Sequence, residues 1–249
     1  MSNTYTDLVK QTFYFPQEGF VTKDGYLYFN DLDLKAIIDK YGTPLKLTYL
    51  PKIGSQINKA KDLFQKAFKK HNYEGKYHYC YCTKSSHFSF VVEEALQHDI
   101  HLETSFAYDI EIINNLYKRK KITKETFIIC NGFKQKTYTS RISRLINTGF
   151  KNVIPILDNK EELDRYKRGV RVPFKLGIRV AAEEEPNFPF YTSRLGIRAK
   201  DILEFYVDQI EGYEEKFQLK MLHIFLNKGI KDLRDSGDYD TIYNKYFIG

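Results

Sequence analysis

The chain has 249 residues, of which 42% are hydrophobic and 29% charged, an ordinary globular composition that is large enough to bury one core. Its 39 basic and 32 acidic residues leave a net charge of only +7, and the charges alternate along predicted helix faces, which argues against a nucleic-acid partner. Three cysteines are too few for a disulfide framework, the first residues carry no secretory signal, and no apolar run approaches the ~20 residues of a membrane span, so we expect a cytoplasmic protein without a membrane partner.

Residues 1–50 are predicted to form an N-terminal extension of short strands and one helix. Turn residues such as Asp24 and Gly25 separate short apolar runs there, and Gly42 closes a helical pattern. The expected elements are strands at Phe13–Phe15, Tyr26–Phe29 and Leu45–Leu50, and a helix at Leu32–Tyr41.

Residues 51–230 alternate between amphipathic helical segments and short apolar runs, starting with a helix at Ile53–Lys70. Runs roughly two dozen residues apart are typical of βα units in a parallel sheet. The six predicted strands are Tyr77–Thr83, Ile100–Ser105, Phe127–Gly132, Asn152–Asp158, Phe174–Ala182 and Met221–Asn227.

Two α/β architectures fit this alternation, an open doubly wound sheet and a closed barrel. No Gly-x-Gly-x-x-Gly follows the first strand, which disfavours a dinucleotide-binding sheet. We therefore predict a (β/α)8 TIM-barrel. With six strands visible where about eight are needed, the barrel is expected to be incomplete.

Lys84 ends the first predicted strand of the barrel. Because side chains alternate along a strand, His78, Cys80, Cys82 and Lys84 should share one face. A partly desolvated lysine at the C-terminal rim can act as a nucleophile toward an aldehyde cofactor, of which pyridoxal phosphate is the commonest. The alternative is a solvated surface lysine. Cys-x-Cys is not a zinc spacing, so no metal is expected.

Five other polar residues lie in or after predicted strands or in a loop, and each has a structural alternative. Glu103 could orient a base or ring nitrogen, or serve the next helix as a cap or ion-pair partner. Asn131 could belong to the site or cap a loop. Arg179 could contact substrate or form a buried ion pair, Arg194 could meet an anion or lie on the surface, and His223 could be catalytic or a satisfied core residue.

Six stretches of the chain resemble motifs of the fold-type III pyridoxal-phosphate decarboxylases, which act on ornithine, lysine, arginine and diaminopimelate. The stretch Ile129–Lys134 is the most specific, because Cys-Asn-Gly-Phe-Lys is similar to Cys-Asn-Gly-Tyr-Lys of biosynthetic arginine decarboxylases. The other five stretches are Tyr41–Leu45, Tyr81–Lys84, Glu103–Glu111, Ser193–Ile197 and Leu222–Phe225.

This resemblance implies a lyase that decarboxylates a basic amino acid with pyridoxal 5'-phosphate, with arginine to agmatine in polyamine biosynthesis as the favoured reaction and a homodimer as the family's assembly. By the same resemblance Lys84 forms the Schiff base, and Lys84, Glu103, Arg194, His223 and Phe225 contact the cofactor. The family has a histidine that stacks on the cofactor ring where this chain has Phe225.

The resemblance ends before the family's glycine-rich phosphate loop and C-terminal β domain. Residues 231–249 instead resemble the closing helices of periplasmic solute-binding proteins, so a truncated or hybrid chain with impaired activity is expected. The alternative function is a non-catalytic barrel that binds pyridoxal phosphate for homeostasis, which would release no carbon dioxide.

Overall fold

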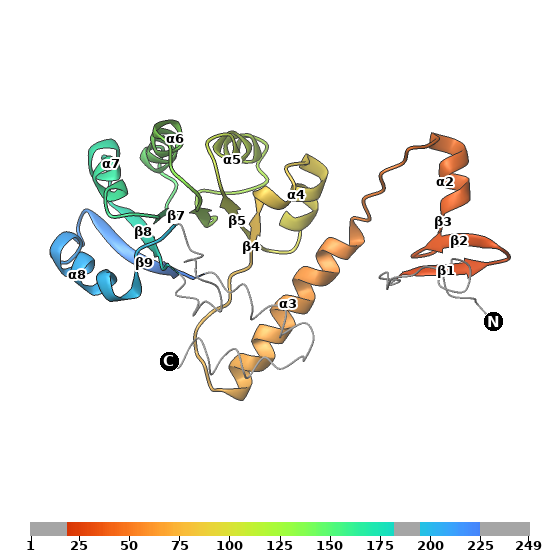
Figure 1. Ribbon diagram of the computed structural model, residues 1–249, viewed down its shortest axis with the longest axis horizontal. Helices are drawn as coiled ribbons and strands as arrows, with labels where there is room; N and C mark the ends of the chain where they lie inside the picture. The colour runs from red at the N-terminus through yellow and green to blue at the C-terminus, as the bar shows by residue number, and fades with distance from the viewer. Residues whose placement is uncertain (1–18, 182–194, 225–249) are drawn as a thin grey trace, which may run out of the picture. The chain divides into compact units, whose positions relative to one another are not determined.

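The computed structural model describes residues 19–181 and 195–224 and divides the chain into two units, Met1–Tyr49 and Leu50–Gly249 (Figure 1). The first unit contains the antiparallel strands β1 (Phe20–Lys23), β2 (Tyr26–Phe29) and β3 (Leu32–Asp33), followed by helix α2 (Leu34–Tyr41). Asp24 and Gly25 both have positive φ, which suits the two-residue turn between β1 and β2. Asp33 caps α2 by accepting a hydrogen bond from the backbone N–H of Ala36.

Three expectations for this unit need correction. The predicted helix Leu32–Tyr41 begins only at Leu34, because Leu32 and Asp33 pair with β2 as strand β3. Residues 45–49 form no strand within the described residues, because their side chains are mostly exposed and their backbone is not paired in the three-stranded sheet. The strand β1 was not predicted, although β2 was, because only its pairing with β2 distinguishes so short a run from a loop. The predicted strand Phe13–Phe15 lies outside the described residues.

The second unit is an α/β structure whose six parallel strands are arranged in sequence order. It begins with α3 (Pro51–Lys70), and each of the first five strands is followed by a helix. The strands are β4 (Cys80–Cys82), β5 (His101–Thr104), β6 (Ile128–Cys130), β7 (Val153–Leu157), β8 (Phe174–Arg179) and β9 (Phe217–His223). The helices are the 3-10 turn η1 (Thr83–Ser85), α4 (Ser89–Leu96), α5 (Asp109–Lys118), α6 (Lys136–Asn147), α7 (Glu162–Gly169) and α8 (Ala199–Gln209).

Each of the six predicted strands overlaps an observed strand, and the parallel sheet is confirmed. The last strand was placed too late, because β9 begins at Phe217 and not at Met221. Helices α4 to α8 follow one another along one side of the sheet in strand order (Figure 1). A doubly wound sheet would reverse its strand order and place helices on both faces. The closed barrel is not seen, since within the described residues β4 pairs only with β5 and β9 only with β8.

Alternating side chains divide the sheet into two packed faces. Leu102, Ile128 and Cys130 join the main core beneath the helices. The opposite face carries a second cluster of Ile129, Ile154 and Ile156, against which Cys80 and Met221 pack. We call this opposite side the inner face. None of the described helices combines the length and the apolar character needed to cross a membrane.

Candidate functional site

Lys84 lies directly after the first strand of the parallel sheet, at the edge where the carboxyl ends of the strands meet. Strand β4 ends at Cys82, two residues earlier than the alternation required, and Lys84 belongs to the turn η1. Its side chain is exposed, so the predicted partial desolvation is not found. The predicted common face therefore holds within β4 for Cys80 and Cys82 and does not extend to Lys84.

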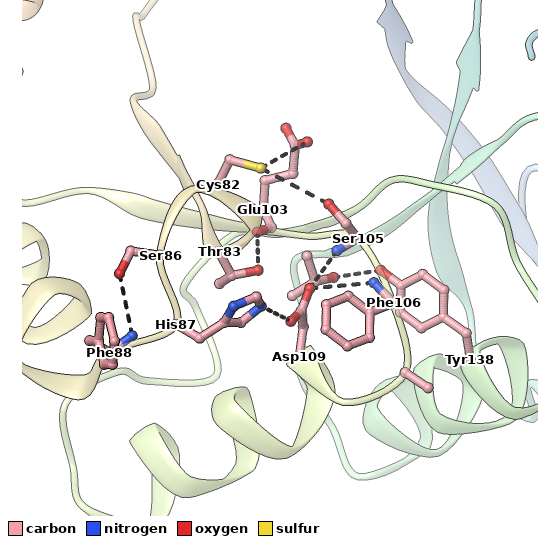
Figure 2. A network of polar contacts seen from close by, with 12 residues as sticks. Cys82, Thr83, Ser86, His87, Phe88, Glu103, Ser105, Phe106, Asp109 and Tyr138 are labelled. Carbon is pink, nitrogen blue, oxygen red and sulfur yellow. Dashed lines mark hydrogen bonds and ion pairs between the residues drawn. The ribbon is translucent and has the colours of Figure 1, made fainter.

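Glu103 lies on the inner face of β5, next to Cys82 in register on β4. Its carboxylate accepts a hydrogen bond from Asn131 Nδ2 over 3.2 Å. It also faces the Cys82 thiol at 3.8 Å (Figure 2). Burial raises the pKa of the Cys82 thiol, and the Glu103 charge raises it further, so this thiol stays protonated and donates. Glu103 forms no cap of helix α5 and no ion pair among the residues that the structure describes.

The turn between β5 and α5 is held by Asp109, which is fully buried. Asp109 Oδ2 accepts hydrogen bonds from the backbone N–H groups of Ser105 at 2.7 Å and Phe106 at 3.3 Å. Its other oxygen lies 3.0 Å from Nε2 of His87, which comes from the segment after Lys84 (Figure 2). The Asp109 carboxylate therefore joins the turn after β5, next to Glu103, to the segment that follows η1.

A buried charge cluster lies farther along the same edge, after β6 and β7. Lys134 is fully buried and donates to the carbonyl oxygen of Gly132 at 2.7 Å. Its amine is 3.7 Å from Asp158 and 3.5 Å from Glu162, and Arg179 of β8 is 3.6 Å from Asp158. The structure thus supports the ion-pair alternative for Arg179.

His223 is the last residue of β9 and pairs in register with Arg179. Burial lowers its pKa below the usual 6.5, and the charges of Arg179 and Lys134 add to that effect, while Glu103 and Asp158 oppose it. The imidazole is therefore uncharged at neutral pH. His223 therefore interacts electrostatically both with Glu103 and with the buried charge cluster around Lys134.

Three of the five predicted cofactor-binding residues, Lys84, Glu103 and His223, lie at this edge, while Arg194 and Phe225 lie outside the described residues. Sequence reasoning assigned no role to Lys134 or Asp109. A buried lysine has no local signature, because the carboxylates that pair with it come from another βα unit. Asp109 could have been found as an acidic residue in the first turn of a predicted helix.

The residues at this edge fit part of what an aldehyde cofactor requires. An exposed lysine amine is accessible to an aldehyde, and a carboxylate with a fixed orientation lies on the adjacent strand. The Oδ1 atom of Asn131 is buried without a hydrogen-bond partner among the described residues, which leaves one acceptor available beside Glu103. Groups that would hold a phosphate are not identified within the described residues.

No protein-family model matches the chain, and no curated protein matches it. Solved structures do match. Diaminopimelate decarboxylase from M. jannaschii in complex with L-lysine aligns with a TM-score of 0.65 at 15% identity, over 84% of this chain and 48% of that one. AQ1208 from Aquifex aeolicus aligns with a TM-score of 0.62 at 17% identity, over 92% and 52%. A second structure of the M. jannaschii enzyme gives 0.65 at 15% identity, over 92% and 54%.

At these identities the likeness concerns the fold alone. This chain is similar in fold to part of each of these proteins, and it spans about half of their length.

Proposed function

We propose that this chain belongs to a pyridoxal-phosphate-dependent decarboxylase of basic amino acids, with Lys84 as the residue that holds the cofactor. The observation that carries the proposal is the position of Lys84, directly after the first strand of the parallel sheet. Parallel α/β barrels place their chemistry at this edge. Glu103 lies one residue before the end of β5, and His223 ends β9 at the same edge. A solved diaminopimelate decarboxylase is similar in fold.

Each residue at the edge has a separate task in this proposal. The exposed Lys84 amine captures the aldehyde, and the bound cofactor supplies an electron sink when carbon dioxide leaves the amino acid. Glu103, oriented by Asn131, provides a fixed negative charge on the adjacent strand. His223 presents an uncharged ring. Arg194 and Phe225 are proposed for the phosphate and the ring face of the cofactor.

Arginine is the proposed substrate, with agmatine as the product. The support is the resemblance of Ile129–Lys134 to biosynthetic arginine decarboxylases, since Asn131 of that stretch is the residue that holds Glu103. A homodimer in the cytoplasm is part of the same proposal.

Borohydride reduction after incubation with pyridoxal phosphate tests the covalent step. Peptide mass spectrometry should find the reduced adduct on Lys84. The exposed Lys76, eight positions earlier in the same segment, serves as an internal control for unspecific reaction. The variant Lys84→Arg keeps the charge and should abolish the adduct. An adduct absent from Lys84, or equally abundant on Lys76, would contradict the assignment.

Release of labelled carbon dioxide tests the reaction and the substrate. Arginine, lysine, ornithine and diaminopimelate should be compared at equal concentration, with Lys84→Arg as the inactive control. We expect release from arginine above the other three. An adduct on Lys84 without release from any of the four would favour the alternative, a barrel that binds the cofactor without turnover.

A further inference from the structure

A groove of about 580 Å³ runs between α6 and α7, on the helix side of the sheet and apart from Lys84. Five of its eleven lining residues are basic and four carry hydroxyl groups, and none of the eleven is acidic. The basic residues are Lys136, Arg144, Arg165, Arg168 and Arg171.

Several other basic residues of the second unit have acidic neighbours. Arg119 and Lys121 both pair with Glu93, and Arg141 pairs with Glu111. In the described part of the chain, the five cations of the groove form no ion pair with a carboxylate. Like charges gathered without counter-charges repel one another and attract anions, so a bound anion would relieve the repulsion.

Helix ends account for only a small part of this charge. The C-terminal ends of α6 and α7 open into the groove, and each carries about half a negative charge. Five positive side chains against about one unit of helix-end charge leave an excess of about four. A single phosphate cannot balance that excess, whereas a chain of three phosphates can.

The walls of the groove are held in place by hydrogen bonds that do not use a ligand. Asn147 of α6 donates from Nδ2 to the carbonyl oxygen of Gly169 at 3.0 Å and accepts the backbone N–H of Arg171 at 2.8 Å. Arg165 donates to the carbonyl oxygen of Lys134 at 2.7 Å. Because these contacts fix the spacing of the two helices, little conformational entropy is lost when an anion binds.

We propose that this groove is a binding site for an oligophosphate, a small ligand that carries a chain of about three phosphate groups. Arginine guanidinium groups pair with phosphate oxygens through two parallel hydrogen bonds, and the hydroxyl group of Ser140 adds a donor at the exposed wall. The volume is that of a small-molecule site. Single-stranded nucleic acid is disfavoured, because no aromatic residue lines the groove to stack on bases.

Calorimetric titration of the full chain tests the proposal with inorganic tripolyphosphate, adenosine triphosphate and inorganic phosphate as separate ligands. The first two should bind, and single phosphate should bind at least about tenfold more weakly because it engages fewer arginines. Equal affinity for the first two would assign recognition to the phosphate chain alone. Tighter binding of the nucleotide would assign part of it to the nucleoside.

Two double variants separate a specific site from general surface charge. Arg144→Gln with Arg168→Gln removes exposed charges from the groove and should weaken tripolyphosphate binding about tenfold or more. Lys118→Gln with Lys200→Gln removes two exposed charges elsewhere and should leave the affinity unchanged. Lys84→Ala should also leave it unchanged, which keeps this result independent of the proposed cofactor site. Thermal unfolding followed by circular dichroism verifies that each variant is folded.

Four results would overturn the proposal. They are no tripolyphosphate binding at low salt, equal affinity of the groove variant and the wild type, equal weakening by the two double variants, and tighter binding of a single-stranded RNA than of tripolyphosphate.

Discussion

Asn131 Nδ2 donates a hydrogen bond to Glu103 Oε1 across 3.2 Å, which joins the loop after β6 to the inner face of β5. Asn131 is buried, and its Oδ1 atom has no hydrogen-bond partner among the described residues. The orientation of the Glu103 carboxylate therefore depends on this amide, together with the weaker Cys82 thiol.

Replacing Asn131 by aspartate should destabilise the fold in a pH-dependent way. The variant Asn131→Asp places a buried carboxylate against that of Glu103, so the folded-state pKa of the pair rises above that of the unfolded chain. The folded state then binds more protons, and the loss of stability should be larger at pH 7 than at pH 4.5. Asn131→Leu, of similar volume, should cost about 1 to 3 kcal/mol with little difference between the two pH values. Urea unfolding followed by circular dichroism measures both, and parallel pH profiles would contradict the pairing.

Gly132 allows the loop after β6 to pass close to the turn after β5. Its φ is +82°, and a Cβ atom at this position would lie 2.4 Å from the carbonyl oxygen of Ser105. Gly132→Ala should therefore cost more than the ~1 kcal/mol of an ordinary strained φ. Gly212, with φ +81° and open space around its Cα, is the matched control. Urea unfolding should show Gly132→Ala as clearly the less stable of the two alanine variants.

The sequence predicted those features of the fold and the site that depend on residues close together in the chain. The order and direction of the strands followed from apolar runs such as Val153–Leu157, which is buried throughout and bounded by helical periodicity. The sequence did not predict correctly which face of the sheet Lys84 shares. The prediction from alternating side chains assumes a continuous strand, whereas the chain turns into η1 after Cys82. Lys134 was missed for the opposite reason, since its burial depends on partners distant in the sequence.

Asp109 should contribute more to the stability of the fold than its hydrogen-bond partner His87. Asp109→Ala removes the acceptor for two backbone N–H groups, those of Ser105 and Phe106, and leaves them without that partner. It should cost about 2 kcal/mol or more. His87→Ala removes one polar contact and an edge-on ring contact with Phe106 from a side chain that is 44% exposed, so its effect should be much smaller. Chemical denaturation of both variants checks the ranking, and the reverse order would show that the histidine carries the turn.

Removing the buried lysine should be among the most destabilising single changes in the second unit. Lys134→Met keeps the volume but leaves Asp158 and Glu162 buried beside each other without their shared cation, which should cost about 3 to 5 kcal/mol. Adding Glu162→Gln to that variant removes one of the two repelling charges and should restore part of the loss. A double variant no more stable than Lys134→Met, measured by guanidinium unfolding, would show that the charges are not coupled.

Glu162 should also give the wild type a pH dependence that Glu162→Gln lacks. Burial raises the pKa of this carboxyl above 4.5, and Lys134 opposes the rise only in part. Between pH 4.5 and the higher folded-state pKa, the folded protein binds more protons than the unfolded chain, so this group makes stability decrease as pH increases. Glutamine keeps an oxygen that can accept the backbone N–H of Asp158 but does not titrate. The free energy of unfolding of Glu162→Gln, relative to wild type, should therefore be more favourable at pH 7 than at pH 4.5, by about 1.4 kcal/mol for each unit of the pKa shift. Urea unfolding at several pH values measures this difference, and a relative stability of the variant that decreases toward pH 7 would mean that Lys134 outweighs burial.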